Sequence, residues 1–538
     1  MRFTFIITIF SILSSCQSKN EWVQVDQTSL SNHIRNLSSD EFLGRMPFTK
    51  GEEITINYLK DEFLKLGLKP GNGSSFFQEV PLIEINGLPS KTMTISGNVS
   101  LEFKLQEDFV AYTQKPIEEV SLDESELVFA GYGIVAPEYG WNDYEGIDWA
   151  GKTAVVLVND PGFTTQDSTL FKGNTMTYYG RWTYKYEEAG RQGAAGIIIV
   201  HDTAPAGYGW NVIQAGFAGA QMNLESNLPR ADLQGWVSTE AAKQLFEASN
   251  LENKNYKELA LSEGFKPMPM GLKTSVSLVN KIKRDVSNNV TAVLPGTDLK
   301  DEYIIYSAHW DHFGIGSTID GDSIYNGAID NATGTALLLG VAEAMKKSNE
   351  QRRSVMFLAV TAEEQGLLGS AYYSENTIID PAKTVANINV DGISCPDKMK
   401  DLTLTGYGQS DMDELAEKAA NTQGRYIKPD GEPHKGYYFR SDHFNFAKIG
   451  IPALYAEGKY EGFTMSHDEV QKTEDDYRTN YYHQPGDEFN LIEGKMEGIT
   501  FDAQLMYQIG SELANSDQWP QWKEGSEFKA IRELSQSK

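Results

Sequence analysis

The sequence predicts an α/β fold in which a mixed, mainly parallel sheet carries helices on both faces, with a second, small β-rich domain inserted into it. After Asn288 strand and helix patterns alternate, and YIIYSA, SVMFLAV and TVANINV are apolar runs typical of buried strands. Strands that alternate with helices of this length form parallel sheets covered on both faces. Before Asn288, short alternating runs and glycine-bounded apolar runs over about residues 95–285 favour a separate domain.

The elements before the inserted domain are helical first and extended later. Residues 22–68 carry apolar residues at helical spacing, including Ile56, Leu59 and Phe63, and Gly67 is a stop signal. Short alternating runs follow and predict strands. We therefore expect three parts: residues 22–94 as the N-terminal part of the main domain, 95–285 as the inserted domain, and 286–538 as the rest of the main domain.

Size and charge exclude two classes of protein. A chain of 538 residues with 40% hydrophobic residues buries a sizeable core, so it is no disulfide-stapled miniprotein. Its formal net charge of −28 argues against nucleic-acid binding, which needs a basic surface to neutralise phosphates.

The N-terminus has the pattern of a secretion signal. Met1 and Arg2 precede the apolar run Phe3–Leu13, which is too short to span a bilayer. LSSC resembles a bacterial lipobox, so we expect a signal peptide over residues 1–15, lipidation of Cys16 and a tether over residues 16–21. The protein would then be exported and held at a membrane only by its lipid anchor. An ordinary signal peptide with an incidental Cys16 is the alternative.

Metal-type side chains follow three of the expected strands. In an open parallel sheet, ligands bind outside the carboxyl ends of the strands. The candidates are His309 and Asp311 after YIIYSA, Glu363 and Glu364 after SVMFLAVTA, Asp391 after TVANINV, Asp330 in NGAIDNATG, and His483 in YYHQPGDEF. Each one alone also fits a cap, a turn or a surface position, but their joint placement at strand ends predicts one site.

Two imidazoles and three carboxylates suit a pair of Zn²⁺ ions with one carboxylate bridging them. Together with one hydroxide this set carries no net charge, so a cleft of low dielectric tolerates it. A fourth carboxylate remains for proton transfer. Glu363 and Glu364 fit this division, because neighbouring residues that leave a strand point in different directions. Asp311, two residues beyond His309, is placed to hold the other imidazole nitrogen.

HWDH, IDNATG, TAEEQGLLGS, NVDG and YYHQPGD resemble, in order and spacing, the ligand motifs of the co-catalytic di-zinc peptidases of metallopeptidase family 28. This family includes bacterial leucyl aminopeptidases, glutamate carboxypeptidases and glutaminyl cyclases. The resemblance covers about residues 288–514 and the helical opening segment, and the inserted block resembles a protease-associated domain. It implies a phosphorylase/hydrolase-like fold, with residues 286–538 as the catalytic zinc peptidase domain.

The resemblance also implies roles for the candidate residues. One zinc would be held by His309 and Asp391, the other by Glu364 and His483, with Asp330 as the bridge, Glu363 as the general base and Asp311 as the residue that orients His309. The family often has a cis peptide bond after the bridging aspartate, so Asp330-Asn331 is a candidate for one.

The implied activity is that of an exported zinc aminopeptidase acting on peptides. The two metals would lower the pKa of a shared water, and Glu363 would take its proton and return it to the leaving amine. A carboxypeptidase of the same fold is the alternative within enzymes. A receptor-like homologue without metals is a third interpretation, which the intact set of metal-type residues argues against. Glutaminyl cyclisation fits the size and the inserted block poorly.

The segment GEPHKGYYFRSDHFNFAKIGIPAL resembles the substrate pocket of the family. We expect Tyr438 to donate a hydrogen bond to the developing oxyanion, although Tyr437 is one residue away. Arg440 fits a substrate carboxylate, or else a structural ion pair with Asp442 or other acids. Ser441 and Asp442 complete the candidate substrate-binding set. The motifs predict neither the preferred substrate residue nor the oligomeric state.

Overall fold

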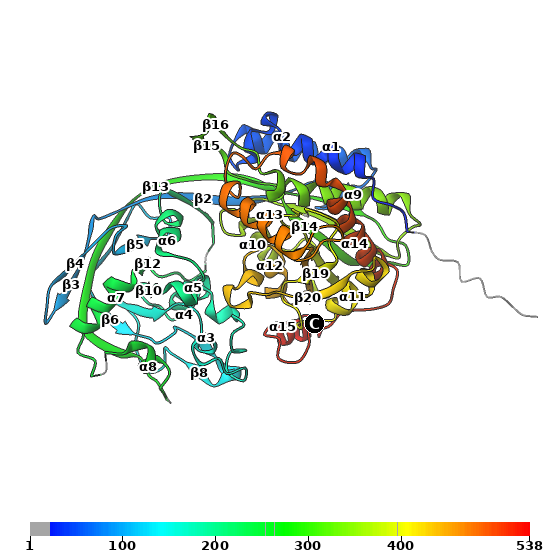
Figure 1. The fold of residues 1–538 in the computed structure, drawn as a ribbon. Coiled ribbons are helices and arrows are strands. Elements are labelled where there is room, and N and C mark those ends of the chain that lie inside the picture. Colours follow the sequence, from blue (N-terminus) through cyan, green and yellow to red (C-terminus); the bar gives the residue numbers. More distant parts are fainter. Residues whose placement is uncertain (1–21, 227, 253, 263, 395, 538) are drawn as a thin grey trace, which may run out of the picture.

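A computed structural model describes residues 22–537 apart from 227, 253, 263 and 395. The expected signal peptide, tether and lipidated Cys16 lie outside the described residues. Two lobes share one hydrogen-bonded sheet, and the long strands β2 (Phe77–Pro89) and β13 (Met268–Leu294) run from one lobe into the other (Figure 1). They pair antiparallel from Phe77 opposite Val290 to Pro89 opposite Leu278.

The sheet of the larger lobe is mixed and mainly parallel, as predicted. Strand β14 lies between β17 and β18 and is parallel to both, β21 is parallel to β18, and β20 is parallel to β19. The pairs β13–β17 and β19–β21 are antiparallel. The strands are β14 (Leu299–His309), β17 (Arg353–Val360), β18 (Thr384–Asn389), β19 (Asp401–Leu404), β20 (Tyr426–Pro429) and β21 (Ala453–Glu457).

Helices cover both faces of this sheet, which confirms the predicted architecture. Along β14 the side chains of Ile304 and Tyr306 join the core beneath one layer of helices, whereas Ile305 packs on the opposite side. The first layer is α1 (Gln27–Leu37), α2 (Lys50–Lys65), α9 (Thr333–Lys347), α11 (Met412–Thr422) and α14 (Met496–Ala514); the second contains α10 (Leu368–Glu375) and α12 (His443–Lys448).

Local sequence signals explain where several helices begin and end. The hydroxyl of Thr49 accepts the Gly51 N–H at the start of α2, and the glycine expected to stop this helix, Gly67, has a φ of +75°. Helix α13 (His467–Asn480) begins with a capping box, because Ser466 and Glu469 each accept a backbone N–H of the other.

The smaller lobe has hydrophobic clusters of its own, formed by residues 93–278. Its strands β6, β9, β10 and β12 are parallel, and β5 closes the row antiparallel to β12. The elements are β3 (Thr92–Gly97), β4 (Leu101–Lys104), β5 (Phe109–Tyr112), β6 (Glu119–Phe129), β9 (Lys152–Leu157), α4 (Trp182–Arg191), β10 (Gly196–Val200), β11 (Ala220–Leu224), β12 (Leu233–Val237) and α7 (Thr239–Ala248). The protease-associated domain and the exact domain boundaries stay predictions.

Among the described residues, none of the helices is both long enough and apolar enough to cross a membrane.

Candidate metal centre

The predicted metal-type residues meet at the carboxyl ends of the parallel strands. Strand β14 ends at His309, β17 leads into Glu363 and Glu364, and β18 leads into Asp391. Because these three strands are parallel neighbours, their carboxyl ends lie at the same edge of the sheet.

His309 lies at the centre of one half of the cluster and is buried. Its Nε2 atom is 3.1 Å from Oδ1 of Asp391, 3.2 Å from Oδ1 of Asp330 and 3.9 Å from Oε2 of Glu363. Three side chains from different elements therefore converge on one imidazole nitrogen.

His483 forms the other half. Its Nε2 atom is 3.3 Å from Oδ2 of Asp330 and 3.3 Å from Oε2 of Glu364. The two oxygens of Asp330 thus face different imidazoles, with His309 on one side and His483 on the other. This is the arrangement that a carboxylate bridging two cations requires.

Asp311 lies beneath the cluster and is fully buried. Its Oδ1 is 3.7 Å from Nδ1 of His309 and accepts the backbone N–H of Glu363 at 3.0 Å. The Nδ1 atom is closer, at 3.2 Å, to the backbone oxygen of Asp311. Asp311 therefore links the end of β14 to the segment that carries the two glutamates.

Sequence reasoning missed two residues that hold the backbone around Asp330. The carboxylate of Asp487 accepts the N–H groups of Ile329 and Asp330, although Asp487 stands in the YYHQPGD motif that drew attention only to its histidine. The motif was the signal that could have identified it.

The other missed residue is Arg45, for which the sequence offers no signal. Its buried guanidinium donates to the backbone oxygens of Trp310, Asn326 and Gly327 at 2.6–2.9 Å. These oxygens lie just after His309 and just before Asp330, so one side chain from the N-terminal segment ties together two of the loops that carry the cluster.

His312 has a defined place beside the cluster. Its Nδ1 atom is 2.6 Å from Oε1 of Glu364, and its ring, Asp330 and Glu364 together have donor atoms close enough to share a cation. Burial lowers the pKa of His312, so its ring is neutral at ordinary pH.

The peptide bond between Asp330 and Asn331 is cis, as the resemblance implied. The side chain of Asn331 continues the connection, because its amide nitrogen donates to the Val390 oxygen and its Oδ1 accepts the Gly392 N–H. These two residues flank Asp391, so the Asp330 and Asp391 loops are joined directly.

Burial and mutual proximity shift the pKa values of the acids in the cluster. Burial, together with neighbouring carboxylates, raises the pKa of Glu363 and of Glu364 well above its ordinary range. Burial also raises the pKa of Asp311 to about 6. For Asp330 burial acts in the same direction, but the neighbouring imidazoles of His309 and His483 outweigh it and hold the pKa well below the usual value.

The residues present fit divalent cations. The carboxylates of Asp330, Glu363, Glu364 and Asp391 each lie within 4 Å of Nε2 of His309 or of His483. Nε2 of His483 is buried without a good hydrogen-bond partner in the cluster. Nitrogen and oxygen donors of this kind are the ligands that zinc prefers.

Comparison with known proteins agrees with this geometry. Residues 289–507 match the model of the protein family described as "Peptidase family M28". Every predicted metal ligand falls in that range. The chain carries a peptidase family M28 domain. The solved aminopeptidase of Aneurinibacillus sp. strain AM-1 covers 92% of this chain and 96% of its own, with 21% identity and a TM-score of 0.51, which shows a shared fold.

Two curated relatives resemble parts of the chain. Aminopeptidase NAALADL1 of Mus musculus is 34% identical over 143 residues, which are 25% of this chain and 18% of that protein. LpqL of Mycobacterium tuberculosis (strain ATCC 25618 / H37Rv), described as a "Probable lipoprotein aminopeptidase", is 28% identical over 264 residues, 46% of this chain and 50% of that one. The chain thus spans half the length, or less, of these relatives.

The cluster of the M28 domain opens into a cavity of about 370 Å³. Arg440 and Ser441 line it, together with Tyr437 and Tyr455. The Ser441 hydroxyl donates to Oδ2 of Asp391 at 2.6 Å, so this residue touches a predicted ligand.

Asp442 does not line this cavity. It is fully buried and accepts the hydroxyl of Ser370 at 2.5 Å, and no ion pair joins it to Arg440 among the described residues. The structure therefore does not bring Asp442 together with the residues that line this cavity, and its contact with substrate stays a prediction.

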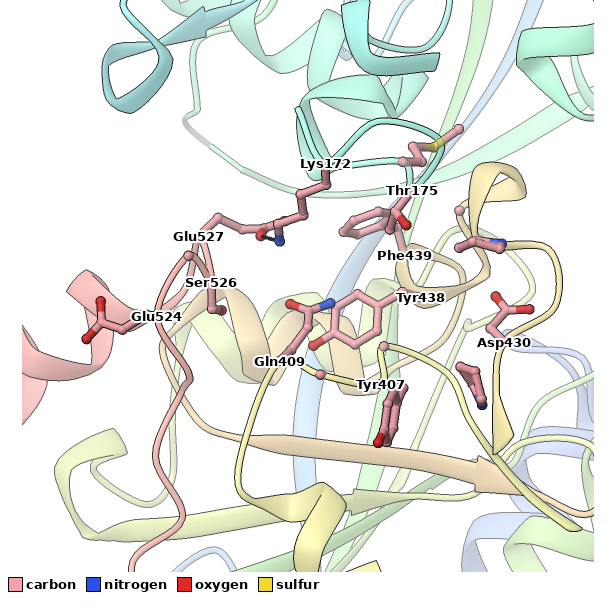
Figure 2. A pocket seen from close by; sticks show the side chains of 17 residues that line it. Lys172, Thr175, Tyr407, Gln409, Asp430, Tyr438, Phe439, Glu524, Ser526 and Glu527 are labelled. Atoms are coloured by element: carbon pink, nitrogen blue, oxygen red, sulfur yellow. Dashed lines mark hydrogen bonds and ion pairs between the residues drawn. The ribbon is translucent and has the colours of Figure 1, made fainter. Parts of the chain in front are cut away.

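Tyr438 also lies outside the residues that line this cavity, and its predicted hydrogen bond to the oxyanion stays a prediction. Its ring packs on Phe528 and lines a second cavity of about 280 Å³, where Figure 2 shows it beside Gln409. Tyr437 and Tyr438 belong to a 3₁₀ turn, in which successive side chains point about 120° apart. The turn directs Tyr437 to the metal-type cluster and Tyr438 away from it.

Proposed function

We propose that this protein is a metal-dependent exopeptidase that removes N-terminal residues from peptides. The observation that carries the proposal is the position of Asp330, whose two oxygens lie 3.2 Å from Nε2 of His309 and 3.3 Å from Nε2 of His483. The match of the surrounding residues to an M28 domain supports the same activity.

Two zinc ions are the proposed cofactors. One ion would be held by His309 and Asp391, and the other by Glu364 and His483. Asp330 would contribute to both. When bound, the ions would polarise the substrate carbonyl and make water more acidic.

Glu363 is the proposed general base. It lines the cavity, and its Oε2 is 3.9 Å from Nε2 of His309, farther than the two aspartates that approach the same nitrogen. The burial that raises its pKa makes Glu363 a stronger base, suited to accept a proton from the attacking water and donate it to the leaving amine. Asp311 orients His309 and fixes the position of the Glu363 N–H.

The discriminating experiment compares aminoacyl chromogenic substrates with N-blocked peptides, with and without a chelator. The proposal expects hydrolysis only of substrates with a free amine, lost on chelation and restored by Zn²⁺. Cleavage of N-blocked peptides from the carboxyl end would contradict the aminopeptidase and favour the carboxypeptidase. No hydrolysis by the zinc-loaded protein would favour a receptor-like homologue.

The carboxypeptidase is a second candidate because of Arg440. Its guanidinium lines the cavity, and no carboxylate among the described residues pairs with it. A guanidinium without a carboxylate partner beside the cluster is what an enzyme that binds a terminal carboxylate needs.

We also propose that the protein is an exported lipoprotein anchored through Cys16. The apolar run that precedes LSSC supports this location, and a relative described as a lipoprotein aminopeptidase is consistent with it. Expression in a bacterium with labelled fatty acid is expected to label the wild type but not Cys16→Ser. An unlabelled wild type that is cut elsewhere would contradict the anchor.

A further inference from the structure

A single turn of the larger lobe, residues 436–440, lies between the two cavities. Tyr437 and Arg440 line the cavity at the metal-type cluster, whereas Tyr438 and Phe439 line the second cavity. Because both sets of side chains come from the same few residues, a contact that fixes the turn on the side of the second cavity also fixes the wall of the first.

The two side chains that line the cavity at the cluster are held within or beside this turn. The Nη2 atom of Arg440 donates to the Lys435 oxygen at 2.6 Å, and its guanidinium lies 5.2 Å from the centre of the Tyr437 ring. The Tyr437 hydroxyl is 3.5 Å from Nη1 of Arg478, at the limit of a hydrogen bond. A movement of the turn would therefore move Tyr437 and Arg440 with it.

On its other side the turn packs against Met176 of the smaller lobe. This side chain is only 6% exposed and shares one apolar cluster with Tyr438 and Phe439. A Cβ added at Gly436 would lie 2.4 Å from the Sδ atom of Met176, so the thioether leaves no space beside the turn. The backbone N–H of Met176 also donates to the Pro433 oxygen at 3.2 Å.

The segment that carries Met176 is fixed within the smaller lobe. The backbone N–H and the hydroxyl of Thr177 both donate to Oδ2 of Asp160, at 3.0 and 2.8 Å, and Asp160 is fully buried. Two residues further on, the Tyr179 oxygen accepts a hydrogen bond from Nζ of Lys185 at 2.6 Å. Met176 thus presses on the turn from an anchored position.

Contacts between the lobes flank Met176 on both sides along the chain. Lys172 forms an ion pair with Glu527 of the larger lobe at 2.5 Å (Figure 2). The ring of Tyr178 lies 4.9 Å from the ring of Phe444, also of the larger lobe. The lobes are therefore packed together at the place where Met176 meets the turn.

We propose that the smaller lobe positions the wall of the cavity that faces the substrate, with Met176 as the positioning residue. The inference rests on the proposed peptidase function. Met176 lines the second cavity, not the cavity at the cluster, so it acts through the turn and not by touching the substrate.

Truncating Met176 would remove the support behind the turn. A void in a closely packed interior costs contacts or lets the neighbouring segment move into it. A displacement of about 1 Å in a group that positions substrate costs up to about 100-fold in rate. Weaker substrate binding is expected rather than slower chemistry, because the metal-type residues at the ends of β14, β17 and β18 belong to other elements.

The test compares two methionine-to-alanine variants of the smaller lobe. Met176→Ala is expected to raise KM at least fivefold for an aminoacyl substrate, with kcat within twofold of the wild type. Met270→Ala removes the same atoms from a fully buried position, in a cluster whose buried members all belong to the smaller lobe. It is expected to lower the melting temperature as well, but to leave KM within twofold of the wild type. Equal changes of KM in the two variants would assign Met176 a merely structural role and overturn the proposal.

Two further substitutions at the same position complete the series. Met176→Leu conserves the volume and is expected to keep KM within twofold of the wild type. Met176→Val removes less than alanine does, is expected to raise KM at least twofold, and replaces Met176→Ala if that variant does not fold. All variants are compared at equal zinc content. A KM that stays at the wild-type value in the truncated variants would overturn the proposal, and so would a loss of zinc confined to them.

Hydrogen exchange separates this proposal from the peptidase function, since it needs no substrate. Mass spectrometry is expected to show amide exchange of residues 436–440 at least fivefold faster in Met176→Ala than in the wild type, and unchanged in Met270→Ala. This pattern in a protein that cleaves no peptide would contradict the proposed function but support the positioning of the turn. The same exchange in both variants would overturn the positioning role, even in an active peptidase.

Discussion

The carboxylate of Asp487 accepts the backbone N–H of Asp330 at 3.1 Å, and its other oxygen accepts the N–H of Ile329 at 3.0 Å. The Tyr477 hydroxyl donates to the same carboxylate, so its direction is fixed from a third side. Asp487 thus determines where the carboxylate shared by the two histidines lies.

Replacing Asp487 with Asn is expected to weaken zinc binding about 10- to 100-fold, the usual effect of a partner that orients a ligand. The amide can accept only one of the two N–H groups and turns a donor toward the other. Zinc affinity is measured by competition with a chromogenic chelator. Asp123→Asn, an exposed change in the smaller lobe, serves as the control. Unchanged affinity in Asp487→Asn would show that the Asp330 loop holds its position unaided.

Glu363→Gln is expected to keep its zinc and lose about 10²- to 10⁴-fold in kcat, because the amide accepts no proton from the attacking water. Metal content by mass spectrometry and turnover on the same preparation give the result. Glu364→Gln is the matched comparison, and there zinc content is expected to fall as well. Near-normal turnover in Glu363→Gln would refute its assignment as the base.

Removing the metal is expected to lower the melting temperature by roughly 5 °C, because tightly bound ions stabilise only the folded chain. The crowded acids around Asp330 then repel one another without a cation between them. Thermal unfolding with a chelator, and again after adding Zn²⁺, measures the effect. In His309→Ala the chelator is expected to change the melting temperature little. If the chelator leaves the melting temperature of the wild type unchanged, the proposed metal centre is contradicted.

Acid is expected to destabilise the protein through His443. Burial lowers the pKa of this fully buried ring from the ordinary 6.5 to about 3, so between these values the unfolded chain binds a proton that the folded chain does not. Stability from this group is present above pH 6.5 and declines as the pH falls toward 3.

By this linkage, His443 accounts for about 2 kcal/mol of the stability lost between pH 7.5 and pH 5. The free energy of unfolding is measured with urea at pH 7.5 and at pH 5. In His443→Gln, which has no titrating ring, its decrease between these pH values is expected to be about 2 kcal/mol smaller than in the wild type. If the wild type and the variant lose the same stability over this interval, another group is responsible.

Much of the fold and of the candidate site could be predicted from local sequence. The apolar runs before His309 and Asp391 indicate buried strands, and parallel strands present their ends at one edge. The position of His309 beside Asp391 follows from these two facts. Asp487 stood in a recognised motif but was missed, because nothing in the sequence tells which backbone N–H a carboxylate accepts.

Tyr438 shows where local reasoning ends. The sequence placed the pair Tyr437 and Tyr438 near the substrate, but a rotation of about 120° within one turn decides which ring faces the cavity. Arg45 is harder still to predict, since it reaches the loops of the cluster from a segment distant in the chain and carries no motif.

The sequence by itself determined the alternation of strands and helices and the residue types of the candidate metal centre, because each depends on spacing within a short stretch. Only the tertiary structure decided which side chains line the cavity, that Asp330 lies between His309 and His483, and that Asp487 accepts the backbone N–H of Asp330. Those relations depend on turn geometry and on packing between elements that the chain connects only through long intervening segments.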